Sequence, residues 1–229
     1  MTRAFDAIVD AYDHWYDTPE GKVIFDAELK CLRSLHAKCP GRWLEVGVGT
    51  GRFACSLGIA TGIDPSPRML DVASTRGIET YEGTAEHLPF PESSFDGVLM
   101  ALTLCFLANP HEALKECQRV LRSRGCLLIG TVPADGPWGR QYRQKASKGH
   151  PVYVLAHFRT AAEIVELVQD AAFTLTHAAT TLFWRPGEAH QAGPQIEAGI
   201  VSGGGFLGLL FEKTASGRFH PGNLKGRGQ

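Results

Sequence analysis

The sequence predicts an α/β protein whose central sheet has seven mostly parallel strands, with helices on both faces. From residue 42 onward, short apolar runs alternate with segments whose apolar residues recur at helical spacing. This alternation is typical of parallel strands joined by crossover helices that cover both faces of a sheet. The apolar runs near 173–184 and 205–213 have no helical segment between them. We therefore expect these two to pair antiparallel, which makes the last strand antiparallel.

Two helices are expected before the first strand, over 3–16 and 20–37, and they form a helical N-terminal cover of residues 1–40. In the second helix, Phe25, Leu29, Leu32 and Leu35 recur at helical spacing. The elements then expected in order are strand 42–46, helix 51–59, strand 60–64, helix 67–76, strand 79–82, strand 95–100, helix 110–121, strand 126–132 and helix 160–171.

Two of these helices have clear start signals. Asn109-Pro110-His111-Glu112 places Asn at the N-cap, Pro at the first helical position and Glu three residues after the cap. Thr160-Ala161-Ala162-Glu163 has the pattern of a capping box. We therefore expect helices to begin at Pro110 and Ala161.

One domain is expected over residues 1–214, because the 229 residues suit a single core. Residues 133–158 are basic and aromatic without a regular period, so we interpret them as an irregular insert after the fifth strand. The Gly-rich, polar residues 215–229 are predicted to be a flexible tail.

The composition bears on whether the protein binds nucleic acid, enters a membrane or holds a metal ion. The formal net charge is -1, which gives no electrostatic argument for a nucleic-acid partner. No apolar run is long enough to span a membrane, and the N-terminus lacks the apolar stretch of a signal peptide, so a cytoplasmic location is expected. The six cysteines include no CxxC pair, so we expect neither a metal site nor a disulfide framework.

The strongest motif is Glu45-Val46-Gly47-Val48-Gly49-Thr50-Gly51, directly after the first predicted strand. Glycines here let the backbone turn sharply and approach a ligand closely, and the following helix start favours an anionic group. A dinucleotide site is the main alternative, but its G-x-G-x-x-G pattern needs glycine where Arg52 stands. The other alternative is a tight turn that binds no ligand.

Two later segments fit a nucleotide-like ligand. Asp64 ends the second strand, 19 residues after Glu45, where an acid can accept both hydroxyls of a ribose. Its structural alternative is the N-cap of the next helix. The turn Thr84-Ala85-Glu86 can expose backbone amides to an adenine edge, and a plain surface loop is the alternative there.

Together these segments resemble the motifs of class I S-adenosylmethionine (SAM)-dependent methyltransferases, in the group typified by the ubiquinone and menaquinone biosynthesis enzymes. The resemblance runs from about residue 5 to 213 and implies a Rossmann-like fold, with SAM as methyl donor and S-adenosylhomocysteine as product. It includes the aromatic segment Tyr12–Thr18, which folds over the cofactor in that group. Ser123-Arg124-Gly125 replaces the usual Pro-Gly-Gly turn, and Thr84 replaces a frequent Asp.

The resemblance implies a role for each matching residue. Glu45, Gly47 and Gly49 would surround the methionine part of SAM, Asp64 would hold the ribose, and Ala101 and Leu102 would flank the sulfonium. The full set of implied cofactor-binding residues is Tyr12, Tyr16, Glu45, Gly47, Gly49, Asp64, Pro65, Ser66, Met69, Thr84, Ala85, Glu86, Ala101 and Leu102.

The acceptor is not fixed by these motifs. Leu102–Leu107, Gly139–Tyr142 and Thr181–Pro186 resemble a small subgroup of methyltransferases whose substrate is not settled. Transfer is an in-line displacement, and a base is needed only when the nucleophile arrives protonated and is weakly acidic. Candidates for such a role are Tyr142, Tyr153 and His157 in the insert on the substrate side, His14 in the cover, and Cys105, each with packing or solvent exposure as its alternative.

We therefore expect SAM-dependent methyl transfer to a small molecule through a nitrogen, sulfur, oxygen or metalloid nucleophile, with the catalytic residues and oligomeric state left open. A protein or RNA acceptor is the first alternative. The Asn-Pro-Pro-Tyr type motif of many enzymes that methylate nucleic-acid amino groups is absent, because Ala101-Leu102-Thr103-Leu104 stands there. The second alternative is a non-catalytic nucleotide-binding module.

Overall fold

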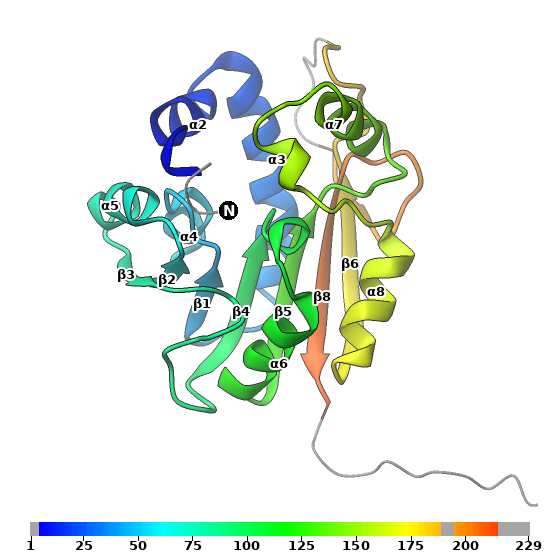
Figure 1. Cartoon of the computed structure of the whole chain (residues 1–229). Coiled ribbons are helices and arrows are strands. Elements are labelled where there is room, and N and C mark those ends of the chain that lie inside the picture. Colours follow the sequence, from blue (N-terminus) through cyan, green and yellow to red (C-terminus); the bar gives the residue numbers. More distant parts are fainter. Residues whose placement is uncertain (1–4, 189–194, 215–229) are drawn as a thin grey trace, which may run out of the picture.

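A single sheet of eight strands runs through the computed structural model, which describes residues 5–188 and 195–214 (Figure 1). Its strand order is β3-β2-β1-β4-β5-β8-β6-β7. Strands β1 to β5 are parallel, and β8 runs antiparallel to both β5 and β6. The strands are β1 Trp43–Val46, β2 Thr61–Asp64, β3 Glu79–Glu82, β4 Phe95–Ala101, β5 Leu121–Thr131, β6 Phe173–Thr181, β7 Glu197–Ala198 and β8 Phe206–Lys213.

The strand order reverses between β1 and β4. From β1 the chain builds outward through β2 and β3 on one side, then returns to place β4 and β5 on the other. Ligands of open α/β sheets bind beyond the carboxyl ends of the strands at such a switch point. The glycine-rich loop after β1 lies at this position.

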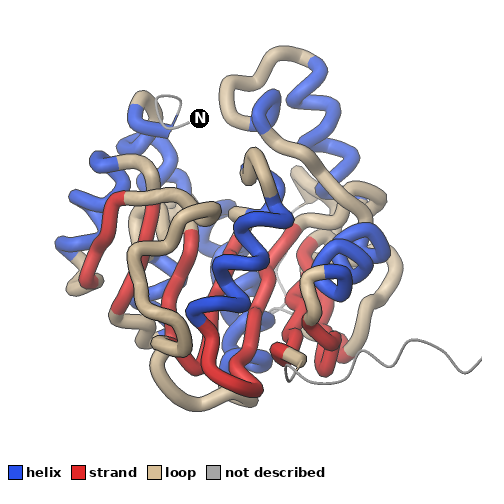
Figure 2. Tube along the Cα trace, turned by 60° about the horizontal axis from the view of Figure 1, so that its bottom comes forward, coloured by secondary structure: helices blue, strands red, loops and turns tan. Residues whose placement is uncertain are grey.

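Helices lie on both sides of the strands (Figure 2). Buried residues of α3, α4 and α5 belong to one apolar cluster, and those of α6 and α8 belong to a second. These two clusters are the two faces of the sheet that the sequence predicts to be covered. The helices are α2 Val9–Trp15, α3 Pro19–His36, α4 Arg52–Leu57, α5 Pro67–Thr75, α6 Pro110–Val120, α7 Pro137–Ser147 and α8 Ala161–Asp170, with short 3-10 turns η1 Leu104–Phe106 and η2 Tyr153–Leu155.

Both predicted helix starts are confirmed. The Asn109 side chain accepts a hydrogen bond from the Glu112 amide at 3.3 Å, with Pro110 at the first helical position. Thr160 and Glu163 form the reciprocal capping box, in which the Glu163 carboxylate accepts from the Thr160 amide at 2.7 Å. These bonds satisfy amides that would have no partner within the helix.

Helix α3 packs closely on the sheet where two strand glycines face it. A Cβ at Gly208 of β8 would lie 2.7 Å from Cδ1 of Leu35, and one at Gly130 of β5 would lie 3.1 Å from Cδ2 of Leu32. The Cys31 thiol donates to the Ala179 carbonyl at 3.3 Å. The side of α3 that faces these glycines is therefore its buried side. Phe25 and Leu29, which the sequence predicts to be buried on this helix, are only partly buried.

Three expected details of the sheet and the N-terminal helix are wrong. The sheet has eight strands instead of seven, because the two-residue β7 adds an edge that is too short to produce a periodic signal. Within 3–16 a turn at residues 7–8 separates helical residues 5–6 from α2, and residues 1–4 lie outside the described part. Strand β5 begins at Leu121, five residues before the predicted start at Cys126, with a register shift against β4.

The predicted irregular insert 133–158 also differs, because it contains α7 and η2. Helix α7 buries only Trp138 and Gly139, so its sequence lacks the apolar stripe by which a helix is recognised. The predicted flexible tail, residues 215–229, lies outside the described residues.

Candidate cofactor and acceptor site

The loop after β1 is shaped by two glycines with left-handed backbone angles. Gly47 has φ +73°, and a Cβ there would lie 2.4 Å from Cγ2 of Thr103. Gly49 has φ +51°, and a Cβ there would meet nothing within 4 Å. The first glycine thus allows the loop to pack against the residues after β4, and the second leaves open space beside the backbone, as a ligand site requires.

Asp64 joins this loop to the next one. Its Oδ2 accepts a hydrogen bond from the Gly49 amide at 3.0 Å, and its Oδ1 accepts from the Ser66 amide at 2.9 Å. Burial raises the pKa of Asp64, and the two amide hydrogen bonds oppose that rise. The N-cap of α5 is Ser66, whose Oγ accepts from the Met69 amide at 3.2 Å, so the capping alternative for Asp64 is excluded.

Glu45 carries an unsatisfied buried oxygen. The residue is 1% exposed, and no hydrogen-bond partner of its Oε2 lies within the described residues. Burial raises the pKa of this carboxyl well above its usual range, a backbone hydrogen bond with Ala54 opposes the rise, and the Asp64 charge adds to it. A buried oxygen without a partner is costly, so the position suits a ligand that offers a hydrogen-bond donor, such as an ammonium group.

The remaining predicted cofactor residues of the strand–helix loops lie in three segments, after β2, after β3 and at the end of β4. Pro65, Ser66 and the buried Met69 lead into α5, and Gly83, whose amide donates to the Asp64 carbonyl at 3.2 Å, leads into Thr84 and Ala85. Glu86 accepts from the Asn109 amide at 3.2 Å, so its side chain binds the start of α6. Ala101 is the last residue of β4. Leu102 follows it with a left-handed φ of 57°, and its amide donates a hydrogen bond to the Gly130 carbonyl at 2.8 Å.

The N-terminal cover brings two tyrosines to the same centre. The hydroxyls of Tyr12 and Tyr16 lie 3.1 Å apart, and their rings meet edge to face at 5.4 Å. Burial raises the pKa of Tyr12 to about 12, the hydrogen bond with Tyr16 lowers it, and the charges of Glu28, Asp64 and Glu45 each raise it. The charges of acids from α3, β1 and β2 therefore all act on the Tyr12 hydroxyl.

Arg52 holds this cover in place. Its guanidinium forms ion pairs with Asp13 and Asp17, each at 2.8 Å, and Arg76 reaches the other oxygen of Asp13 at 2.8 Å. Burial opposes ionisation of Asp13, but hydrogen bonds from Arg52 and Arg76 hold its pKa well below the usual range. Arg52, which stands where the dinucleotide-binding pattern requires glycine, thus connects α4 to α2 through its ion pair with Asp13.

The catalytic candidates divide sharply by environment. His14 and His157 are exposed, whereas Tyr142 is partly buried and stacks on Tyr153 with ring centroids 4.5 Å apart. Burial raises the pKa of Cys105 to about 12, so it remains a thiol at neutral pH. Tyr142 therefore differs from the two exposed histidines in having a partly buried ring that packs against another aromatic side chain.

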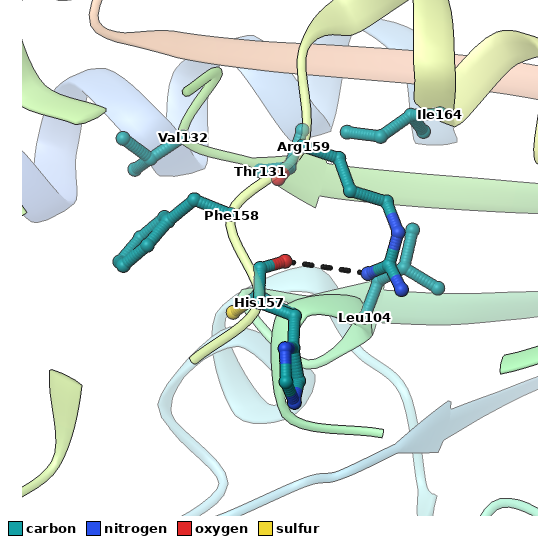
Figure 3. A pocket seen from close by; sticks show the side chains of 8 residues that line it. Leu104, Thr131, Val132, His157, Phe158, Arg159 and Ile164 are labelled. Carbon is teal, nitrogen blue, oxygen red and sulfur yellow. Dashed lines mark hydrogen bonds between the residues drawn. The ribbon is translucent and has the colours of Figure 1, made fainter. Parts of the chain in front are cut away.

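Cys105 and His157 instead line a small cavity behind η1 (Figure 3). The His157 amide donates to the Cys105 carbonyl at 2.7 Å, and Arg159 donates to the His157 carbonyl at 3.3 Å. The cavity volume is about 10 Å³, which is room for one water molecule. Its other walls are Leu104, Thr131, Val132, Phe158, Arg159 and Ile164.

Sequence reasoning missed Glu28, which is 4% exposed on α3. The position falls three residues after Phe25 and four before Leu32, inside the apolar spacing of that helix. An acidic residue at an apolar position of the helical spacing could have indicated this site. It does not stand out in the sequence because many helices carry polar residues beside their apolar side. Burial raises the pKa of Glu28 to about 8.

Neither a membrane span nor a metal cluster is found in the part of the chain that the structure describes. No helix there is long and apolar enough to cross a membrane. Residues 5–188 and 195–214 also contain no group of three or more His, Cys, Asp or Glu side chains suited to a metal ion.

Comparisons with known proteins agree with this architecture. Residues 44–129 match the family model described as a methyltransferase domain. An uncharacterized protein of Mycobacterium tuberculosis is 40% identical over 199 residues, which cover 87% of this chain and 70% of that protein. A demethylmenaquinone methyltransferase of Tropheryma whipplei is 42% identical over 94 residues, covering 38% of this chain and 39% of that enzyme.

A solved structure from Thermotoga maritima extends the similarity to the whole chain. It is described as a SAM-dependent methyltransferase and possible histamine N-methyltransferase, and it is 34% identical with a TM-score of 0.85. The alignment covers 93% of this chain and 99% of the Thermotoga protein. The unpartnered Oε2 of Glu45, the open space at Gly49 and the partly buried Asp64 also suit the ammonium and ribose groups of SAM. This chain therefore belongs to the class I SAM-dependent methyltransferases.

Proposed function

We propose that the enzyme methylates a small molecule, through a nitrogen, sulfur, oxygen or metalloid nucleophile, and that SAM is held where β1, β2 and β4 end. The single observation that carries the assignment of the cofactor site is the buried, unpartnered Oε2 of Glu45 beside the Gly47–Gly49 loop. A cationic ligand group at this point removes the cost of burying that oxygen.

Each neighbouring residue takes a role in this proposal. Glu45 accepts hydrogen bonds from the ammonium of the methionine part, and Asp64 accepts from the ribose hydroxyls. Pro65, Ser66 and Met69 lie beside the ribose and adenine, and Thr84, Ala85 and Glu86 form the turn near the adenine. Ala101 and Leu102 flank the sulfur, while Tyr12 and Tyr16 close the site from above.

The proposed reaction needs little covalent help from the protein. When bound, SAM supplies a methyl group on a positively charged sulfur, which the acceptor displaces in line. The chain's own contribution is to orient the acceptor and to exclude water. The ion pairs of Arg52 with α2, and the insert with α7, support such an enclosure because they lie at the same end of the sheet (Figure 1).

A small acceptor is favoured over a macromolecule by the enclosing elements. Helix α2 and the aromatic insert lie over the strand ends, where a protein or RNA chain would need an open approach. The similarity to the Thermotoga protein, which is described as a possible histamine N-methyltransferase, also supports a small acceptor.

The cofactor assignment is tested by titrating SAM and S-adenosylhomocysteine into the protein in a calorimeter. Asp64→Asn should weaken both ligands at least about tenfold, because it removes a charged hydrogen-bond acceptor. Asp71→Asn on the exposed side of α5 is the matched control and should leave both affinities unchanged. Equal binding by wild type and Asp64→Asn would contradict the site.

The acceptor class is tested by measuring S-adenosylhomocysteine formation with amines, thiols, phenols and metalloid oxyanions. Parallel reactions contain bulk RNA or a mixture of proteins. Turnover with small molecules supports the proposal. Methylation of RNA or protein alone would overturn the small-molecule part and leave the cofactor site standing.

A further inference from the structure

The chain turns sharply directly after β4, and the turn is strained. Leu102 has a left-handed φ of 57°, which residues other than glycine rarely adopt. Its amide donates to the Gly130 carbonyl at 2.8 Å, so the neighbouring strand β5 holds it in this conformation. Strained backbone persists only where the surrounding structure fixes it, and it is concentrated at functional sites. The strained turn thereby fixes the place of the next residue, Thr103.

The hydroxyl of Thr103 lies between two backbone carbonyls. Its Oγ1 donates to the Ala101 carbonyl at 3.1 Å and to the Gly47 carbonyl at 3.4 Å. A hydroxyl carries one proton, so the two carbonyls share it. Ala101 is the last residue of β4, and Gly47 directly follows β1, the strand beside β4 in the sheet. The Thr103 side chain therefore joins the ends of two neighbouring strands.

Gly47 is held from both sides of β1. Its amide and that of Val48 donate to the Ile63 carbonyl of β2, at 2.8 and 3.0 Å. Its own carbonyl accepts from Thr103, on the side of β4. Because β1 lies between β2 and β4, these bonds fix Gly47 at the point where the strand order reverses. Thr103 supplies the link on the β4 side of this point.

The loop after β1 also packs directly on Thr103. A Cβ at Gly47 would lie 2.4 Å from both Cγ2 and Oγ1 of Thr103 and 3.0 Å from its Cβ. Carbon atoms in ordinary contact are about 3.5–4.0 Å apart, so a glycine is needed for this approach. At Gly49, two residues further on, a Cβ would meet nothing within 4 Å. The same loop is therefore packed against Thr103 at one glycine and open to a ligand at the next.

We propose that Thr103 is a positioning residue for methyl transfer. By fixing the gap between the loop after β1 and the segment after β4, it sets where the methyl-bearing sulfur of SAM lies. This inference rests on the proposed function, in which the methionine part lies beside Gly47 and the sulfur beside Ala101 and Leu102. Thr103 acts through the carbonyls of Gly47 and Ala101 and does not touch the reacting atoms.

The two forms of the cofactor differ at the position that Thr103 controls. SAM carries a methyl group and a positive charge on its sulfur, and S-adenosylhomocysteine carries neither. A shift of either loop changes the room beside the methyl group and the direction of two nearby carbonyl dipoles. The rest of the two molecules is the same, so their other contacts change equally. Loss of the Thr103 hydroxyl should therefore weaken SAM more than S-adenosylhomocysteine.

The test titrates both forms of the cofactor into full-length protein in a calorimeter. Thr103→Val replaces the hydroxyl by a methyl group of similar size, and Thr103→Ser keeps the hydroxyl. We expect Thr103→Val to raise the Kd of SAM at least about fivefold more than that of S-adenosylhomocysteine, which is the scale of one hydrogen bond. Thr103→Ala should shift the ratio of the two Kd values in the same direction, and Thr103→Ser should restore it to within about twofold of wild type.

A control variant removes a threonine hydroxyl elsewhere. Thr75 is exposed on α5, and its Oγ1 donates to the Val72 carbonyl at 2.6 Å, so it also bonds to a backbone carbonyl. Thr75→Val should leave both affinities unchanged. An effect confined to the Thr103 variants that lack the hydroxyl therefore reports on the link between the two loops.

A stability measurement tests the contact without any ligand. Thr103→Ala removes the Cγ2 and Oγ1 atoms that a Cβ at position 47 would meet. The fall in Tm caused by Gly47→Ala should therefore be at most about half as large in the Thr103→Ala background as in the wild type. The strain from the backbone angle of Gly47 is common to both backgrounds and cancels in this comparison.

The outcomes separate this inference from the proposed function. A ratio of SAM to S-adenosylhomocysteine affinity that stays unchanged in Thr103→Val, or that Thr103→Ser alters equally, overturns the positioning role and leaves the cofactor site standing. An equal fall in Tm from Gly47→Ala in both backgrounds contradicts the contact on which the role depends. Failure of the wild type to bind SAM refutes the proposed cofactor site instead.

Discussion

Replacing Glu28 by Gln should remove a pH-dependent loss of stability from the unliganded protein. Burial raises the pKa of Glu28 from 4.5 to about 8, so across this window the folded protein holds a proton that the unfolded chain has released. The unfolded state then binds fewer protons than the folded state, and the free energy of unfolding falls as the pH rises. No cost is present below pH 4.5, and the full cost is reached above pH 8.

The size of the effect follows from those two pKa values. Their difference corresponds to at most about 5 kcal/mol of unfolding free energy. Partial titration gives a cost of about 2 kcal/mol at pH 6 and about 4 kcal/mol at pH 8. Gln has nearly the same shape and never ionises, so the stability of the variant relative to wild type should rise by about 2 kcal/mol between these pH values.

Urea unfolding of both proteins at pH 6 and pH 8 measures this difference. Comparing the two proteins at each pH cancels the contributions of Glu45 and the other acids, which both carry. Asp26→Asn is the control and should follow the wild type at both pH values. Parallel pH dependence of wild type and Glu28→Gln would refute the claim that burial raises the pKa of the Glu28 carboxyl.

Three further predictions concern the cover, the glycine loop and Cys105. Arg52→Gln removes a partly buried ion pair to Asp13 of α2 and an exposed one to Asp17, and should lower Tm by about 2–4 °C and weaken SAM binding. Calorimetry measures both effects, and Arg68→Gln, whose 3.5 Å pair with Asp10 is exposed, should change neither. Gly47→Ala should cost about 2–4 kcal/mol because its Cβ meets Thr103, whereas Gly49→Ala should cost about 1–2 kcal/mol from its backbone angle alone. Urea unfolding compares the two, and an equal cost would contradict the predicted clash. Cys105→Ser should keep kcat within about twofold, since its buried thiol has a pKa of about 12 and supplies no thiolate. A much larger loss of kcat in the methyl-transfer assay would indicate that Cys105 takes part in the reaction.

Much of the fold could be predicted because its signals are local. The caps at Asn109 and Thr160 specify their helices through bonds within four residues, and alternation of strands and helices specifies the parallel sheet. The antiparallel β8 followed from the missing helix before it, and the structure confirms it. Helix α7 and strand β7 escaped prediction because neither carries an apolar period of useful length.

The candidate site likewise has a part that local sequence patterns predict and a part that they do not. Glu45, the glycine loop and Asp64 lie within 20 residues of one another in a recognisable pattern, so the sequence could indicate a SAM site. Glu28 on α3 and Tyr142 on α7 are more than 100 residues apart in the sequence, yet the Glu28 charge contributes to the raised pKa of Tyr142. No spacing in the sequence indicates this proximity, which only the folded chain produces.

The close approach of α3 to the sheet has a consequence for the buried acid that this helix carries. Gly130, the penultimate residue of β5, pairs with Gly208, the third residue of β8, and the two glycines set how near Leu32 and Leu35 can come. Glu28 is one turn before Leu32 on the same rigid helix, so a methyl group added at either glycine would push α3 and the Glu28 carboxyl outward. Two residues without side chains therefore set how deep this acid lies, and variation there can shift it while the sequence of the helix stays the same.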